Sequence, residues 1–265
     1  MSFVQINNEP PLYFEKAGED KPLILITGLS GNASFWHCQR EAFAEAHQVI
    51  TYDQRGSGKS PLNQGDISID HMVTDLLNLM NWLDIEEADI VGHSLGGAIA
   101  QTLALNHPDR VGRLVLSSTW SKPDLRFLRL HELRSAYLQE FGALAYLKTN
   151  PLFLYPAWWL RQHPELLEVA EQDVSRLMPD QVATLARMEV LPVFETFEFL
   201  SNIQSSTLVM GADDDMVTPT SMQEELVECI PDARIKLFSR GGHFYPQVRA
   251  EAFNQAVLQF LDDAS

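Results

Sequence analysis

A serine between two glycines is the first group in the chain that could do covalent chemistry. Gly92, Ser94 and Gly96 form the pattern G-x-S-x-G, between the apolar run 88–91 and a stretch of small residues from 94 to about 106. A serine on such a tight strand-to-helix turn is exposed for attack, and the helix N-terminus favours negative charge beside it. We therefore predict that Ser94 is a nucleophile. The alternative interpretation is a glycine-rich turn that holds an incidental serine.

A serine hydroxyl needs a base to remove its proton, and His243 is the best candidate for that base. It follows the apolar run 234–238 and the glycines Gly241 and Gly242, which let a loop turn. His93 is expected to pack beneath Ser94. The other histidines are expected on helices or at their ends, in packed or solvated positions: His37, His47, His71, His107, His131 and His163.

The base needs an acid that orients it, and three consecutive aspartates follow the apolar run 206–210. Asp215 stands before Met-Val-Thr-Pro, where an acid just ahead of a helix is expected. Asp214 lies three residues after Gly211 and remains an alternative. We favour Asp215. The order serine, aspartate, histidine then matches a known arrangement of serine hydrolases.

Two backbone amides are candidates for stabilising a developing oxyanion. The amide of Leu95 lies at the N-terminus of the helix that follows Ser94. The amide of Leu29 lies in the loop of residues 28–31, which follows the apolar run 22–27. Two such donors form an oxyanion hole. For the loop of residues 28–31, the alternative interpretation is a plain glycine turn without a role in catalysis.

The elements that must position these groups alternate between strand and helix. Strands are expected at residues 22–27, 48–52, 88–91, 113–117, 206–210 and 234–238. Helices are expected around 40–46, 68–83, 94–106, 221–229 and 250–261. This alternation predicts an α/β fold with a mostly parallel central sheet and helices on both of its faces.

The alternation stops between residues 120 and 201, where helical periodicity and apolar clusters occur without a convincing strand. We predict a core of residues 1–119 and 202–265 with a helical cap, 120–201, inserted after about the sixth strand. The cap carries an aromatic cluster of Phe153, Tyr155, Trp158 and Trp159. These rings either dock the cap on the core or line a substrate pocket, and both roles are compatible.

Together these motifs resemble the α/β-hydrolase superfamily over nearly the whole chain. Thr27-Gly28-Leu29 resembles the His-Gly-x oxyanion motif of that family, with threonine in place of histidine. Asp53-Gln54-Arg55-Gly56-Ser57-Gly58 resembles its Asp-x-Arg-Gly-x-Gly turn, for which the resemblance implies a structural role. Because the expected oxyanion donor is the backbone amide of Leu29, a threonine at position 27 does not change the prediction of an oxyanion hole.

A narrower resemblance is to the aminoacrylate hydrolases of pyrimidine degradation. It rests on Tyr-Asp-Gln-Arg-Gly at 52–56 and on the cap segment 151–159, Pro-Leu-Phe-Leu-Tyr-Pro-Ala-Trp-Trp. The resemblance implies hydrolysis of a small enamine acid or a related carbamate. Some members of that group lack the serine, whereas this chain keeps Ser94, so an esterase or lactonase with a similar cap is also expected.

Composition excludes several other classes. The 265 residues carry a formal net charge of −17, which would repel a nucleic acid. Gly58-Lys59-Ser60 lacks the glycine that a phosphate-binding loop needs at position 53, where Asp53 stands. No G-x-G-x-x-G follows the first strand, and no histidine or cysteine spacing suggests zinc. We expect no cofactor and no metal.

The remaining expectations concern location and partners. Residues 1–11 have no signal-peptide pattern, no apolar run could span a bilayer, and Cys38 and Cys229 are expected to be reduced thiols. These observations predict a cytoplasmic protein, monomer or homodimer, that acts on a small molecule and contacts neither nucleic acid nor membrane. The competing function is a non-catalytic relative of the same fold that binds a small ligand or protein.

Overall fold

The computed structural model describes residues 2–5, 10–29, 32–62, 67–178 and 180–263. Within these residues, eight strands form one sheet in the order β1-β2-β4-β3-β5-β6-β7-β8. Their bounds are Ser2–Val4 (β1), Leu12–Ala17 (β2), Lys21–Ile26 (β3), His47–Tyr52 (β4), Ala88–His93 (β5), Val111–Ser117 (β6), Thr207–Ala212 (β7) and Ala233–Phe238 (β8). The pairs from β4 to β8 are parallel, and β2 runs antiparallel to both β1 and β4.

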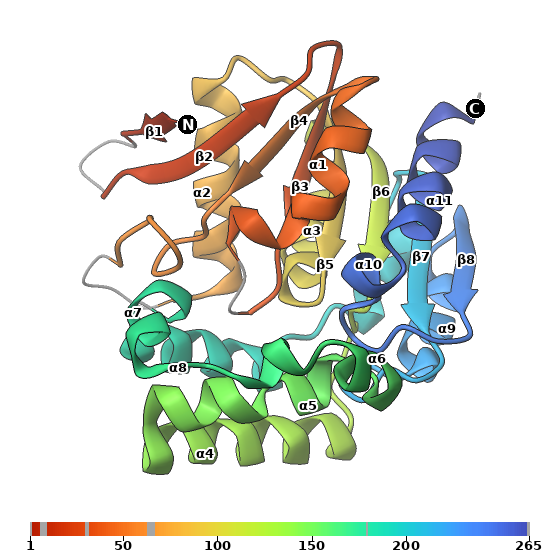
Figure 1. The fold of residues 1–265 in the computed structure, drawn as a ribbon. Coiled ribbons are helices and arrows are strands. Elements are labelled where there is room, and N and C mark those ends of the chain that lie inside the picture. The colour runs from red at the N-terminus through yellow and green to blue at the C-terminus, as the bar shows by residue number, and fades with distance from the viewer. Residues whose placement is uncertain (1, 6–9, 30–31, 63–66, 179, 264–265) are drawn as a thin grey trace.

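Helices cover both faces of this sheet (Figure 1). The core helices are α1 (His37–Ala44), α2 (Ile69–Trp82), α3 (Leu95–Asn106), α9 (Thr220–Cys229), α10 (Tyr245–Val248) and α11 (Ala250–Asp262). Apolar side chains of α2, α3 and α9 pack in one buried cluster, and those of α1 and α11 pack in a second. The parallel strands from β4 to β7 in the sheet are therefore buried on both faces, which explains their continuous apolar runs, whereas β8 at the edge of the sheet is largely exposed.

A segment made of helices connects β6 to β7, as expected for an insertion after the sixth strand. Its α-helices are α4 (Leu125–Thr149), α5 (Pro151–Leu154), α6 (Ala157–Gln162), α7 (Val174–Leu177) and α8 (Gln181–Val190). Figure 1 shows these helices, coloured green to teal, gathered across one end of the strands. We call residues 120–201 the cap segment; its division from the core at these two positions remains a prediction.

Strands β1 and β2 have no counterpart among the strands expected from the sequence, and one histidine lies elsewhere than expected. In β2, the buried Leu12, Tyr13 and Phe14 are followed by the charged Glu15 and Lys16, so its apolar run is shorter than those of the central strands. His47 was expected on a helix or at its end, but it begins strand β4. Within the described residues, no helix is long and apolar enough to cross a membrane.

The strand register brings the candidate residues to one edge of the sheet. His93 on β5 pairs with Ser117 on β6, and Ser117 pairs with Met210 on β7. Ala212, at the end of β7, pairs with Phe238 at the end of β8. Because these strands are parallel, the loops that follow them meet at their shared carboxyl edge.

Candidate active site

Ser94 lies on a strained turn between β5 and α3. Its φ of 55° and ψ of −119° lie in a region that non-glycine residues rarely adopt. The turn is held from both sides: the Ser94 amide donates to the Ser117 carbonyl at 2.9 Å, and the Thr119 hydroxyl donates to the Ser94 carbonyl at 2.8 Å. Such strain persists only where the surrounding structure enforces it.

The two glycines that flank Ser94 are required by close approach. A Cβ at Gly96 would lie 2.2 Å from the Ile26 carbonyl oxygen on β3. A Cβ at Gly92 would lie 2.4 Å from the carbonyl oxygen of Gly96 itself. The motif therefore lets α3 start directly against the sheet, which a plain glycine-rich turn would not require.

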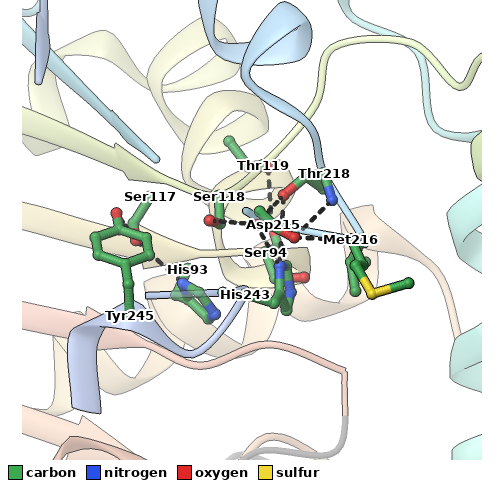
Figure 2. Close-up of polar contacts among 12 residues, drawn as sticks. His93, Ser94, Ser117, Ser118, Thr119, Asp215, Met216, Thr218, His243 and Tyr245 are labelled. Atoms are coloured by element: carbon green, nitrogen blue, oxygen red, sulfur yellow. Dashed lines mark hydrogen bonds and ion pairs between the residues drawn. The ribbon is translucent and has the colours of Figure 1, made fainter. Parts of the chain in front are cut away.

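Asp215 and His243 form a buried hydrogen-bonded pair (Figure 2). His243 Nδ1 lies 2.9 Å from Asp215 Oδ2, and both side chains are almost fully buried. The ring nitrogen Nδ1 then carries the proton, which leaves Nε2 as the basic nitrogen. No acceptor or donor bonds to that Nε2 within the described residues, and His243 and Ser94 line the same cavity.

Further donors hold the Asp215 carboxylate in place. The hydroxyls of Ser118 and Thr218 donate to Oδ2 at 2.7 and 2.9 Å. The amides of Val217 and Thr218 donate to Oδ1 at 2.7 and 3.0 Å. Burial alone raises the pKa of Asp215, but His243 and these hydrogen bonds outweigh it and lower that pKa below its ordinary value. The carboxylate is thus kept charged.

Asp214 has a different position. Its Oδ1 accepts hydrogen bonds from the amides of Gly241 and Gly242, each at 2.7 Å. These bonds fix the loop that carries His243, where Gly242 adopts a φ of +63°. Of the two aspartates left open by the sequence, Asp215 therefore contacts the imidazole, and Asp214 contacts the backbone of its loop.

The two expected oxyanion donors lie beside Ser94. A Cβ at Gly28 would be 3.7 Å from Ser94 Oγ, which places the turn preceding Leu29 against the nucleophile. Leu95 is the first residue of α3. Within the described residues, no backbone hydrogen bond uses the amide of Leu29 or of Leu95. Ser30 and Gly31, which complete the predicted loop, lie outside the described residues.

A buried arginine of the cap segment connects to this loop. Arg187 on α8 donates to the Gln54 side-chain carbonyl and, at 3.4 Å, to the Arg55 backbone carbonyl. Gln54 Nε2 in turn donates to the Thr27 carbonyl at 2.7 Å. The resemblance implies a structural role for the turn of residues 53–58, and these bonds give it one: Gln54 links the cap segment to the strand end before Leu29.

The cavity above Ser94 has a volume of about 320 Å³ and is walled largely by the cap segment. Two of its polar wall residues, His131 and Arg134, were not singled out by the sequence analysis as site residues. They lie one turn apart on α4, on a face that is otherwise buried. A histidine and an arginine at i and i+3 on a buried helix face is the signal that could have identified them.

The four residues of the aromatic cluster were expected either to dock the cap on the core or to line a substrate pocket, and they differ in which of these roles their contacts show. Tyr155 lines the cavity and donates to Gln247 Oε1 at 2.7 Å, so it both docks the cap segment and borders the site. Trp158 packs edge-on against Trp159, which stacks on His163, and neither tryptophan is among the cavity residues. Phe153 borders a separate cavity.

His93 packs beneath the site, as expected. It is fully buried, stacks on Phe35 and lies within 3.0 Å of the Ser117 hydroxyl through Nδ1. The Ser117 hydroxyl also lies 2.6 Å from the Tyr245 hydroxyl. Burial lowers the pKa of His93 well below its ordinary value, so this ring is a neutral support.

Comparisons with known proteins agree with this architecture. Residues 21–246 match the family model described as "alpha/beta hydrolase fold". The chain is 38% identical over 245 residues to "Putative carbamate hydrolase RutD" of Caulobacter segnis, covering 91% of each chain. It is 36% identical to the protein of the same name from Azorhizobium caulinodans, covering 95% of each.

Solved structures show the same fold over the full length. The enol-lactonase of Burkholderia xenovorans LB400 superposes with a TM-score of 0.89 at 24% identity and covers 99% of this chain and 100% of its own. A thermophilic esterase from Thermogutta terrifontis, with malate bound, has a TM-score of 0.86 at 26% identity and covers 98% of each. The family match, the relatives and the fold together identify this chain as a hydrolase that belongs to the α/β-hydrolase fold family.

Proposed function

We propose that Ser94, His243 and Asp215 hydrolyse a small carbonyl substrate by two-step acyl transfer. The Ser94 hydroxyl attacks the carbonyl carbon while His243 Nε2 accepts its proton. The same proton then passes to the leaving group, whose bond to the carbonyl carbon breaks. In the second step a water molecule attacks the acyl carbon and gives a proton to His243. His243 then passes this proton to Ser94 Oγ as the bond between Oγ and the acyl carbon breaks and the acid leaves.

The observation that carries this proposal is the buried pair of His243 and Asp215 at the cavity that Ser94 also lines. Asp215 remains charged and accepts the Nδ1 proton, so it would orient the ring and stabilise the imidazolium that forms during attack. The amides of Leu29 and Leu95 are proposed to bind the oxyanion. Each such donor contributes roughly 3 kcal/mol to lowering the barrier in other serine hydrolases.

The proposed substrate is a small carbamate, with small esters and lactones as the related class, because each has a leaving group on a carbonyl carbon. An enamine acid has no such group; it would lose ammonia after water adds to its imine tautomer, a route that forms no acyl-enzyme. The RutD relatives are named as carbamate hydrolases, and they match this chain over more than nine-tenths of its length. A cavity of about 320 Å³ lies at the small end of ligand pockets, which favours a compact substrate. The cap segment would exclude water from the reacting carbonyl.

We also propose a cytoplasmic protein that acts on a small molecule, without a nucleic-acid or membrane partner. Cys38 and Cys229 are free thiols, which suits a reducing compartment. The net charge of −17 disfavours contact with phosphate backbones.

A fluorophosphonate probe tests the nucleophile. We expect the wild type to be labelled at one site, Ser94→Ala to lose the label, and Ser221→Ala to keep it because Ser221 is exposed on α9. Two activities should be lost together with the label in Ser94→Ala and kept in Ser221→Ala. They are the hydrolysis of methyl butyrate and the release of ammonia in a coupled pyrimidine-degradation assay. A wild type that is neither labelled nor active in either assay would instead indicate a non-catalytic binding protein. Ammonia release that survives in Ser94→Ala would contradict acyl transfer in that assay and favour addition of water to an enamine acid instead.

A further inference from the structure

The cap wall of the catalytic cavity contains a buried arginine. Arg134 is 5% exposed and lies on α4, and it borders the cavity together with Ser94 and His243. His131 lies one turn earlier on the same helix and borders the same cavity. Neither side chain takes part in the acyl-transfer steps described above.

The hydrogen bonds of Arg134 leave its charge unbalanced. Nη2 donates to the Tyr146 hydroxyl at 2.8 Å and to Asn150 Oδ1 at 2.7 Å, and both acceptors are neutral. Within the described residues, no carboxylate forms an ion pair with this guanidinium. The buried Nε has no hydrogen-bond partner there either.

Such an arrangement is costly unless something else supplies the missing charge. A buried cation loses its hydration, and only a counter-ion with good hydrogen-bond geometry offsets that loss. The chain has 36 acidic side chains, yet none of those described forms an ion pair with Arg134. Because Arg134 borders the cavity, the counter-ion can be a group on the molecule that binds there.

His131 adds a neutral polar group at the same wall. Neither of its ring nitrogens has a hydrogen-bond partner within the described residues. Burial, followed by the charge of Arg134, lowers the pKa of His131 to about 3, so the ring is neutral at pH 7. A neutral imidazole offers one N–H donor to an anion without adding a second charge.

A second cavity of about 250 Å³ also touches Arg134, together with Tyr146 and Phe153. The exposed wall of that cavity is formed almost entirely by carbon atoms. It offers no surface to a charged group. We therefore expect a charged ligand to meet the guanidinium from the catalytic cavity and not from this second cavity.

We propose that Arg134 binds a carboxylate of the substrate, assisted by an N–H of His131. Two parallel N–H groups of a guanidinium match the two oxygens of a carboxylate, and one arginine balances one negative charge. The cavity then selects short carbonyl compounds that carry a carboxylate away from the reacting carbonyl. Hydrolysis of these compounds rests on the proposed function, whereas binding of their carboxylate to Arg134 does not require Ser94 to react.

Two methyl esters of matched length test the selection. Monomethyl succinate and methyl butyrate have acyl chains with the same number of carbons, and only the former ends in a carboxylate. We expect the wild type to favour monomethyl succinate in kcat/KM and Arg134→Gln to lose that preference by about 10- to 100-fold. Hydrolysis of methyl butyrate by Arg134→Gln should fall much less than hydrolysis of monomethyl succinate. Arg129→Gln is the matched control, because Arg129 is an exposed arginine on the same helix.

A binding measurement separates this inference from the proposed function. We expect Ser94→Ala to bind succinate in calorimetry and Ser94→Ala/Arg134→Gln to bind it at least about tenfold more weakly. That result supports the carboxylate site even if no ester is hydrolysed. Equal affinity in the two proteins overturns the inference. So does an equal loss of activity on both esters in Arg134→Gln, since that outcome makes Arg134 a structural residue.

Discussion

At the scale of single residues, the two neighbouring aspartates, Asp214 and Asp215, differ in the hydrogen bonds that they accept. Asp215 accepts from the imidazole, and Asp214 accepts from two loop amides. They are adjacent in sequence and similar in chemistry, so the sequence favoured Asp215 but left Asp214 as an alternative. The difference arises because the chain turns after β7, which directs one carboxylate toward the loop after β8 and the other toward the His243 ring.

This difference predicts unequal effects of one conservative substitution. Asp215→Asn should lower kcat by about 10⁴-fold, because an amide cannot stabilise the imidazolium or hold the same tautomer. Asp214→Asn keeps an oxygen that can accept from the two glycine amides, so its kcat should stay within about tenfold of the wild type. Steady-state hydrolysis of methyl butyrate measures both. A larger loss in Asp214→Asn than in Asp215→Asn would reverse the assignment.

At the scale of elements, the site depends on contacts between the cap segment and the core. Arg187 on α8 reaches the turn after β4 through Gln54, and Gln54 reaches Thr27, the residue that follows β3. The resemblance to the family implies a structural turn at 53–58. The partner of that turn on the cap segment could not be inferred, because it lies 133 residues away in sequence.

Breaking this link should loosen the oxyanion loop. Arg187→Met keeps much of the buried stem and removes both hydrogen bonds, so we expect kcat to fall by about tenfold or more. Arg176→Met is the control, because Arg176 is an exposed arginine on α7 of the same segment. Thermal unfolding should accompany the kinetics. A normal kcat in a less stable Arg187→Met protein would show that the link supports folding alone.

At the scale of the whole molecule, buried histidines make stability depend on pH. His131 has a pKa of about 3 in the folded protein, against about 6.5 for an unfolded chain. Between these values the unfolded state binds a proton that the folded state does not. The free energy of unfolding therefore falls as the pH falls through this window, by about 1.4 kcal/mol per pH unit for this one group. His93 acts in the same direction.

Urea unfolding between about pH 6.5 and pH 4.5 measures this effect. We expect His131→Gln to lose stability less steeply with acid than the wild type, because the substituted side chain does not titrate. His107→Gln should match the wild type, since His107 is exposed. Identical slopes for His131→Gln and the wild type would mean that the His131 ring is protonated in the folded protein.

The sequence by itself determined the local chemistry and the order of the core elements. Continuous apolar runs mark strands that are buried on both faces, and the glycines around Ser94 mark a turn where backbones meet. These are short-range requirements, so they leave a direct trace in the residues. The helices and strands of the core follow the expected order, although α1 begins at His37, three residues before the expected start.

Only the tertiary structure decided which groups meet across long separations. The choice between Asp214 and Asp215, the anchor at Arg187 and the cavity positions of His131 and Arg134 all depend on how the loops and the cap segment pack. A buried arginine and an exposed one look alike in a helical sequence. Their environments differ because of neighbours contributed by distant elements, and those neighbours also decide which charge remains for a ligand to balance.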